Sequence, residues 1–194
     1  MPTPDNNKVE FGISQLHVGT YEIDSKGDVV LGTPYHQKGA VSLSLDPESE
    51  DNNFFADNVK YYSGYSDNGY TGSIEVAKFD TDFKTQFLGY AAVTGGGVAK
   101  VKTKNAPKTY VAFQTEGDAE ARRVLLLNVS FGEIQREFST IEENKEPVTE
   151  TIDITVDGDN NTGITQVTFK PADTGYSTLF SAPTMPAIAT GTGG

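Results

Sequence analysis

Apolar and polar residues alternate over many short stretches of the chain, which is the pattern of β-strands that bury one face. The alternation is clear over residues 41–45, 74–76 and 152–156. Over 124–131 both parities are apolar at first, which indicates a strand that is buried on both faces. The apolar parity then changes after Gly132, and a glycine at such a change is typical of a β-bulge or a bend.

Turn-forming residues separate the apolar stretches. The Asp-Pro pair at 46–47 is predicted to end one strand, and the Asp-Asn-Gly sequence at 67–69 is predicted to form a turn. A glycine-rich hairpin tip is expected over 94–98, and an Asx-rich loop over 157–161. Short alternating strands joined by such turns indicate two packed antiparallel sheets, arranged as a sandwich or a flattened barrel.

One helix is predicted in the sequence FDTDFKTQFLGY. Asp80 has the position of an N-cap, and Gly89 has that of a C-terminal stop. An apolar stripe at helical spacing accompanies these signals and consists of Phe79, Phe83, Phe87 and Leu88. Because so short a helix is marginal alone in water, the stripe is expected to pack on a sheet. A second, weaker helical pattern covers 173–180.

The two ends of the 194-residue chain differ in composition from its middle. Residues 1–7 are small and polar, and we expect a flexible N-terminal arm there. Residues 181–194 are rich in proline, glycine and small residues and are expected to form a flexible tail, which leaves one β-domain over 8–180. The polar start does not match a secretion signal, and no apolar run approaches the ~20 residues that cross a bilayer. We therefore expect synthesis in a cytoplasm and no membrane insertion.

Charge and cysteine content narrow the function classes. Fifteen basic residues against 27 acidic residues give a formal net charge of −12. Proteins that hold nucleic acids derive much of their affinity from basic side chains, so this balance argues against DNA or RNA binding. The chain has no cysteine, which excludes disulfides and thiolate metal sites.

Motifs for catalysis and for metal binding are missing from the sequence. His17 and His36 have no companion histidine at metal-ligand spacing, and each is interpreted as a structural histidine. The serine elbow and the P-loop are both absent. The acidic segments 46–51 and 157–163 could attract calcium, but the second lacks the glycine and the glutamate that an EF-hand requires, so an Asx-rich hairpin turn is preferred. We therefore expect no enzyme, no metal and no cofactor.

Charged residues are unevenly distributed. Lys100, Lys102 and Lys104 alternate with other residues, which predicts three positive charges on one side of a strand. Such an edge discourages indiscriminate strand pairing and is equally suited to an acidic neighbour. From Glu133 to Asp159 nine acids stand against two bases.

Residues 54–70, FFADNVKYYSGYSDNGY, hold six aromatic rings. A position in the buried core explains Phe54 and Phe55 as readily as a functional surface does. Binding of single-stranded nucleic acid would need a basic track beside the rings, and Lys60 is the only base in the segment. Carbohydrate stacking is chemically feasible, although the chain has no tryptophan. Tyrosine-rich surfaces with glycine and asparagine also form protein interfaces, and a self-association surface is the interpretation that we prefer.

Longer phrases carry a family resemblance. They are NKVEFGISQLHVGTY, GAVSLSLDPESE followed by FFADN and YY, NGYTGSIEVAKF with DF and FLGY, and RRVLLLNVSFGEIQREFSTIEENKEPVTETIDITV. In this order they resemble the major tail tube proteins of long, non-contractile-tailed bacteriophages, from about residue 8 to residue 180. The resemblance implies two packed antiparallel sheets with one flanking helix.

The resemblance also implies a function. It describes a structural virion protein that is made in the host cytoplasm and forms hexameric rings, which stack into the tail tube for genome ejection. The expected partners are other copies of the chain and the tape-measure, tail-terminator and distal tail proteins. DNA is expected to pass without specific binding, because an acidic lumen repels a polymer with one negative charge per ~1.7 Å of its axis.

Two sets of residues are candidates for these contacts. The subunit-interface candidates are Phe54, Phe55, Tyr61, Tyr62, Tyr65, Tyr70, Lys100, Lys102, Lys104, Asp46, Glu48, Glu50 and Asp51. The candidates for an acidic lumen or for subunit contacts are Glu133, Glu137, Glu142, Glu143, Glu146 and Glu150. The alternative function is a carbohydrate- or calcium-binding β-sandwich, such as an adhesin or a receptor-binding module.

Overall fold

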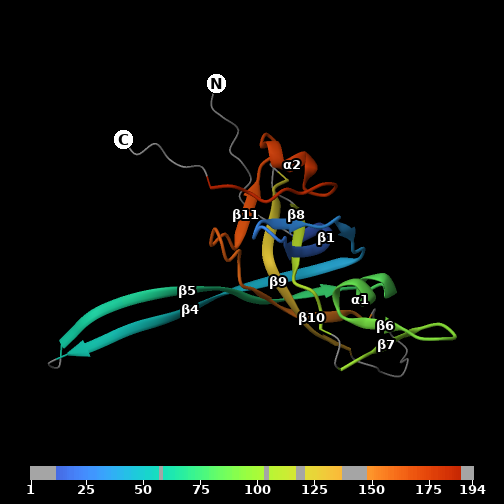
Figure 1. Ribbon diagram of the computed structural model, residues 1–194, viewed down its shortest axis with the longest axis horizontal. Helices are drawn as coiled ribbons and strands as arrows, with labels where there is room; N and C mark the ends of the chain where they lie inside the picture. The colour runs from blue at the N-terminus through green and yellow to red at the C-terminus, as the bar shows by residue number, and fades with distance from the viewer. Residues whose placement is uncertain (1–11, 57–58, 103–104, 117–120, 137–147, 189–194) are drawn as a thin grey trace.

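The computed structural model describes residues 12–56, 59–102, 105–116, 121–136 and 148–188, with the backbone alone over 50–56 and 59–67. Strands account for most of these residues, and two short helices accompany them (Figure 1). In chain order the elements are β1 (Gly12–Ile23), β2 (Val29–Leu31), β3 (Tyr35–His36), β4 (Ala40–Ala56), β5 (Val59–Val76), α1 (Thr81–Phe87), β6 (Tyr90–Ala92), β7 (Val98–Lys100), β8 (Thr109–Glu116), β9 (Arg123–Gln135), β10 (Glu150–Val156), β11 (Gln166–Phe169) and α2 (Thr174–Thr178).

A nine-stranded antiparallel sheet forms the body, with β2, β1, β8, β9, β10, β5 and β4 side by side in this order. β3 also pairs with β1, and β11 also pairs with β9. β6 and β7 form a separate two-stranded sheet. The predicted class is confirmed, because the protein is mainly β with antiparallel sheets and short helices. The two sheets are unequal in size because β9 links most strands into one ladder, pairing with β8 on one side and with β10 and β11 on the other.

β4 and β5 continue beyond the body as a two-stranded ribbon (Figure 1). β5 pairs with β10 from Tyr70 to Val76. Beyond that point Ser49–Ala56 pairs with Val59–Asp67, and within the described chain these two segments, here called the arm, pair with each other alone. At about 3.3 Å per residue the arm is roughly 26 Å long.

The sequence predicted a strand end at 46–47 and a turn at 67–69. Both positions lie inside strands, so both predictions are wrong. The Asp-Pro pair at 46–47 does not end β4, which continues through a register shift between Pro47 and Ser49. Proline is tolerated there because β4 lies at the edge of the sheet. The sequence at 67–69 is a bulge in β5 rather than a turn, with Gly69 at a φ of +92°. Bulges and turns share a preference for glycine at positive φ, so the local pattern does not separate them.

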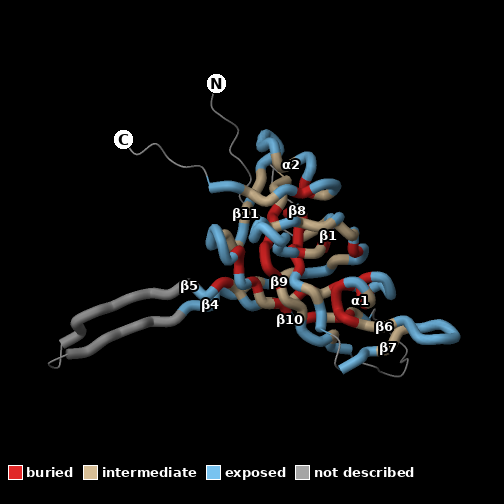
Figure 2. Tube along the Cα trace, viewed as in Figure 1, coloured by how far each residue is buried: buried red, intermediate tan, exposed pale blue. Residues whose placement is uncertain are grey.

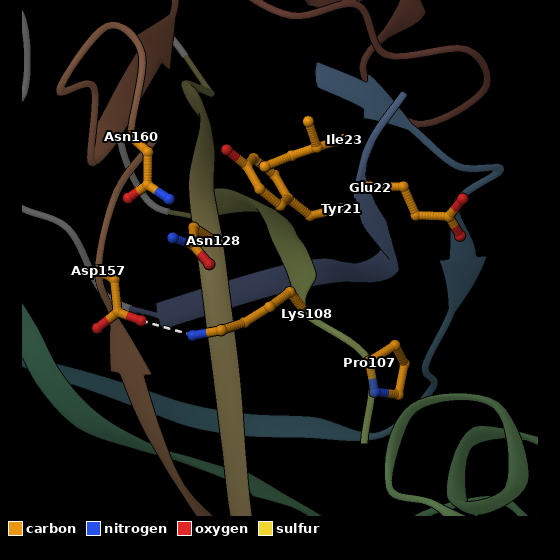
Figure 3. Close-up of a pocket in the computed structure, with 8 residues that line it drawn as sticks. All are labelled: Tyr21, Glu22, Ile23, Pro107, Lys108, Asn128, Asp157 and Asn160. Carbon is orange, nitrogen blue, oxygen red and sulfur yellow. Dashed lines mark hydrogen bonds and ion pairs between the residues drawn. The ribbon is translucent and has the colours of Figure 1, made fainter. Parts of the chain in front are cut away.

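Two irregularities interrupt β9. Gly132 and Glu133 lie opposite the single residue Asp153 in the register with β10, which confirms the bulge predicted at Gly132. A second bulge, which the sequence pattern did not predict, includes Asn128 at a φ of +55°. The buried Asn128 amide donates a hydrogen bond of 2.7 Å to the Gly158 carbonyl and so joins β9 to the loop after β10 (Figure 3).

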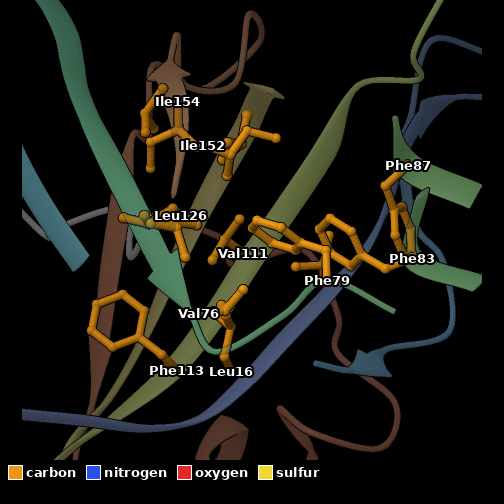
Figure 4. Close-up of a cluster of buried hydrophobic side chains, with 14 of the residues drawn as sticks. Leu16, Val76, Phe79, Phe83, Phe87, Val111, Phe113, Leu126, Ile152 and Ile154 are labelled. Atoms are coloured by element: carbon orange, nitrogen blue, oxygen red, sulfur yellow. The ribbon is translucent and has the colours of Figure 1, made fainter. Parts of the chain in front are cut away.

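The predicted helix is confirmed as α1, and its apolar stripe packs on one face of the sheet (Figure 4). The ring centroids of Phe79 and Phe83 are 4.9 Å apart, and those of Phe83 and Phe87 are 5.3 Å apart. Asp80 occupies the N-cap position in an extended conformation, and Gly89 follows the helix at a φ of +67°. The stripe therefore seals the first of two apolar clusters.

β8 and β9 are buried on both faces, as the apolar row at 124–131 predicted (Figure 2). Val124 and Leu126 enter the first cluster, which α1 covers. Leu125 and Leu127 enter a second cluster on the opposite face. The two central strands therefore belong to both cores.

Residues 173–188, here called the C-terminal segment, include α2 and pack against the second cluster. Leu179 is buried there, and Met185 is half-buried against it. The second predicted helical pattern is thus confirmed as α2. The packed body extends to Met185, beyond residue 180, where the sequence predicted a flexible tail to begin.

Candidate assembly surfaces

The arm brings most of the aromatic run together on one ribbon. In its register Phe54 lies opposite Tyr62, and Phe55 lies opposite Lys60. A register shift between these pairs leaves Tyr61 as an extra residue on β5. The positions of these side chains lie outside the described part of the structure, so their role as interface residues stays a prediction.

The remaining members of the aromatic run divide between the arm and the body. Tyr65 lies opposite Asp51 in the arm, and Glu50 lies opposite Ser66. Tyr70 lies in the body, where it is half-buried and packs against the first cluster. At least one ring of the run therefore belongs to the core of the subunit.

The segment 46–51 is not the acidic loop that the sequence predicted, because all of it lies in β4. Asp46 and Glu48 are exposed near the base of the arm. Glu50 and Asp51 continue along the same strand into the arm. The acids therefore follow a sheet edge, where backbone groups stand beside them, and this arrangement differs from a loop that wraps an ion.

The three alternating lysines do not lie on one strand face. β7 ends at Lys100, and the exposed Lys102 lies in a turn, so the prediction is wrong for this pair. Lys104 lies outside the described residues. The Lys100 Nζ atom is 2.9 Å from the Glu133 carboxylate and 5.3 Å from the centroid of the Tyr90 ring. Lys100 therefore connects the small sheet to the bulge of β9.

The predicted lumen acids have different environments. The Glu133 side chain is 73% exposed, and Glu137, Glu142, Glu143 and Glu146 lie outside the described residues. Glu150 is buried inside the subunit: its carboxylate accepts a 2.8 Å hydrogen bond from the Phe79 amide. The same carboxylate is 3.4 Å from Lys84 Nζ and 3.0 Å from Arg136 Nε. Glu150 is therefore engaged in joining α1 and β9 to β10 and is not a surface acid.

A pocket of about 590 Å³ opens beside the end of β1 (Figure 3). Four of its polar side chains, those of Tyr21, Lys108, Asn128 and Asp157, are already bonded within the subunit. The Lys108 Nζ atom lies 2.6 Å from an Asp157 carboxylate oxygen, and the Tyr21 hydroxyl donates a 2.6 Å hydrogen bond to Asp159. A saccharide site needs polar groups that converge on a ligand, so this pocket gives the carbohydrate alternative no support.

The loop at 157–163 is the Asx-rich turn that the sequence predicted. The buried Asp159 carboxylate accepts 2.6 Å hydrogen bonds from the Thr162 amide and hydroxyl as well as from Tyr21. Burial alone would raise the pKa of Asp159, but the hydrogen bonds from Thr162 and Tyr21 outweigh it and lower the pKa. Burial, reinforced by Asp159, raises the pKa of Tyr21. Among the described residues, no group of three or more histidines and acids is arranged to hold a metal ion.

Both histidines lie in a row of stacked planar side chains, and sequence reasoning did not find this row. His17 on β1 lies opposite His36 on β3, and their ring centroids are 4.6 Å apart with planes inclined by 12°. The Phe180 ring stacks on the other face of His17 at 4.4 Å. Beyond Phe180, the Arg123 guanidinium lies 4.2 Å from the Phe180 centroid and 4.1 Å from that of Tyr176. These residues are distant in the sequence, so no local pattern indicates their contact.

No family model and no curated protein matches the chain. Among solved structures, a chain of the "Cryo-EM structure of the anti-feeding prophage cap (AFP tube terminating cap)" is similar, with a TM-score of 0.39 and 12% sequence identity. The match covers 87% of this chain and 98% of that chain. A TM-score of this size does not establish a shared fold. In the described ranges, the helices are too short or too polar to span a membrane.

Proposed function

We propose that this protein is the repeating subunit of a bacteriophage tail tube, in which hexameric rings stack into the conduit for genome ejection. The observation that carries the proposal is the arm, a long two-stranded ribbon that leaves the body and pairs with itself alone among the described residues. The ordered sequence phrases that resemble tail tube proteins support the same function.

The arm is an unusual feature for a protein that acts as a monomer. A two-stranded ribbon without a third strand or a packed face is marginally stable in water, and its outer edges present unpaired backbone groups. When another copy of the chain covers the ribbon, the ribbon gains packing contacts and its edge backbone groups gain hydrogen-bond partners. The arm is therefore the surface that gains most from assembly.

The position of the arm suits a contact between two different surfaces of neighbouring subunits. The arm projects from one side of the body, so its contact with the body of a second copy joins two different surfaces. A contact of this kind builds a ring where its rotation closes and a filament where it does not, and a tube of stacked rings needs one contact of each type. At the ends of the tube, the tape-measure, tail-terminator and distal tail proteins would meet the same surfaces.

The negative charge of the chain supports a conduit that does not retain DNA. It also makes assembly depend on the salt concentration. Residues 46–67 contain six acids and one lysine, and the whole chain carries a net charge of −12. Copies of the chain repel one another at low ionic strength, and salt screens this repulsion. We therefore expect tubes to form more readily at about 0.5 M than at about 0.05 M salt.

Electron microscopy of the concentrated protein tests the proposal. Rings and tubes are expected for the full chain. A variant in which residues 49–67 are replaced by Asn-Gly, so that a tight turn joins Glu48 to Asn68, should lose the stacks. The melting curve of this variant is the control, because it shows that the body has folded. A full chain that stays monomeric at every concentration and salt tested would contradict the proposal.

The lumen assignment has a separate test. Replacement of Glu137, Glu142, Glu143 and Glu146 by lysine should leave rings able to form and should make them retain DNA at low salt. The matched control replaces the same residues by glutamine, which removes charge without adding the opposite sign. Unchanged retention of DNA in the lysine variant would remove these acids from the lumen and leave the tube proposal intact.

A further inference from the structure

A row of five stacked side chains fastens the C-terminal segment to the sheet. In spatial order the row consists of His36, His17, Phe180, Arg123 and Tyr176. Two of them, Phe180 and Tyr176, belong to the C-terminal segment, and they alternate in space with side chains of the sheet. Removing the segment from the sheet therefore requires that the row separate.

The other contacts of the C-terminal segment are few and are not strand pairs. Arg123 donates a 2.5 Å hydrogen bond to the Tyr176 carbonyl, and the Tyr176 hydroxyl donates one of 2.8 Å to the Ala121 carbonyl. The buried Leu179 adds an apolar contact on the second cluster. Because no described residue of the segment pairs with a strand of the sheet, the segment can open without breaking the ladder.

Two basic side chains lie near the middle of the row. His17 is only 7% exposed, and β3 places His36 on one side of it, while β9 supplies the nearby Arg123. The C-terminal segment presents the uncharged Phe180 ring, and β1 itself presents the Gln15 carbonyl, 2.7 Å from Nδ1. Burial lowers the pKa of His17, and His36 and Arg123 lower it further, against the opposing effect of the Gln15 carbonyl.

We propose that this row is an acid-sensitive latch: protonation of His17 adds positive charge in a buried stack that already contains Arg123, and the C-terminal segment is then released. Release uncovers the apolar side chains of the second cluster, among them Leu125 and Leu127. The latch is a property of the folded subunit and does not depend on the tube proposal.

The direction of the pH effect follows from proton linkage. The pKa of His17 is lowered in the closed state and returns toward its ordinary value of 6.5 when the segment opens. The open state then binds more protons, so the latch is complete above about pH 6.5 and weakens as the pH falls below it. Between pH 7.5 and 5.5 the open fraction should rise by up to about tenfold.

Hydrogen exchange of the full chain, read by mass spectrometry at pH 7.5 and 5.5, tests the latch. After correction for the pH dependence of intrinsic exchange, protection of residues 173–188 should fall by up to about tenfold at the lower pH, while protection of β10 should not change. In His17→Phe an uncharged ring keeps the stack without a titrating group, and the pH response of the segment should be lost. The same pH response in wild type and His17→Phe would overturn the proposal.

A second measurement does not depend on a folded variant. NMR titration of the wild-type protein follows His17 directly, and His17 is expected to titrate below the ordinary histidine value of 6.5, with the resonances of the C-terminal segment shifting over the same pH range. Titration of His17 at or above pH 6.5, or a segment whose resonances do not move as His17 titrates, would contradict the latch.

Discussion

The arm and the β8–β9 pair are stabilised in opposite ways. β8 and β9 contribute side chains to both apolar clusters, and Val111, Leu125 and Leu126 have no exposed surface. Each large apolar side chain that is fully buried contributes about 1.5–3 kcal/mol. Among the residues that the structure describes, each strand of the arm has one neighbour, and the ribbon leaves the sheet (Figure 1). The difference separates two roles along one chain, because the body holds the fold and the arm is available for contact with other copies.

The largest loss of stability is expected in the body. Phe83→Ala removes a ring that contacts both Phe79 and Phe87 in the first cluster. The cavity should lower the free energy of unfolding by about 3–5 kcal/mol, measured by urea denaturation. The exposed control Val93→Ala should change it by less than about 0.5 kcal/mol. A Phe83→Ala loss as small as the control would mean that α1 does not seal this core.

The next effect concerns the buried acid. Glu150→Ala leaves the Lys84 ammonium without its buried partner and the Phe79 amide without an acceptor. We expect a loss of about 3 kcal/mol in the free energy of unfolding. Glu133→Ala removes a carboxylate that is 73% exposed, and its ion pair should contribute less than about 1 kcal/mol. Equal losses in the two variants would contradict the distinction between the buried and the surface acid.

A smaller effect is expected at the loop after β10. Tyr21→Phe removes the hydrogen bond to the Asp159 carboxylate and should cost about 1–2 kcal/mol at neutral pH. The pKa of Asp159 is lowered in the folded state, so its contribution is complete above its ordinary value of 3.8 and is lost as the pH falls below it. Thermal melts from pH 7 to pH 3 should therefore show a shallower acid loss in Tyr21→Phe. If the melting temperature fell equally with pH in wild type and Tyr21→Phe, a group other than Asp159 would be responsible for the acid loss of stability.

The smallest effect on stability is expected for the arm. Replacement of residues 49–67 by Asn-Gly removes none of the described side chains of either apolar cluster, and it should change the free energy of unfolding by less than about 1 kcal/mol. Urea denaturation of this variant therefore complements the microscopy proposed above. A loss of several kcal/mol would show that the arm stabilises the body, and the separation of roles would then fail.

Local patterns predicted the parts of the fold that depend on nearby residues. The helix Thr81–Phe87, the bulge at Gly132 and the two-faced burial at the start of the row 124–131 follow from apolar spacing and from one glycine. The sequence did not separate the bulge at Gly69 from a turn, because glycine at positive φ serves both. It could not show that β4 continues past Pro47, since that depends on pairing with β5.

The candidate surfaces were harder to predict because they depend on contacts between distant residues. Glu150 has the sequence neighbourhood of a surface acid, and its burial results from Lys84, Arg136 and the Phe79 amide. The row through His17 and Phe180 joins residues from opposite ends of the described chain. No periodicity or spacing encodes such contacts. The grouping of the aromatic residues on one ribbon depends on the pairing of β4 with β5 beyond residue 47, and the sequence did not predict it either.

The continuity of β5 from the arm into the body has a mechanical consequence. The strand passes from the arm into seven consecutive pairs with β10, from Tyr70 opposite Val156 to Val76 opposite Glu150. A pull along the arm loads these pairs in shear, so their hydrogen bonds resist together instead of opening one after another. The chain leads directly from Val76 to Phe79, whose amide is bonded to Glu150. Tension on the arm is thus carried into the core through the backbone, and the ribbon acts as a tether for the whole subunit.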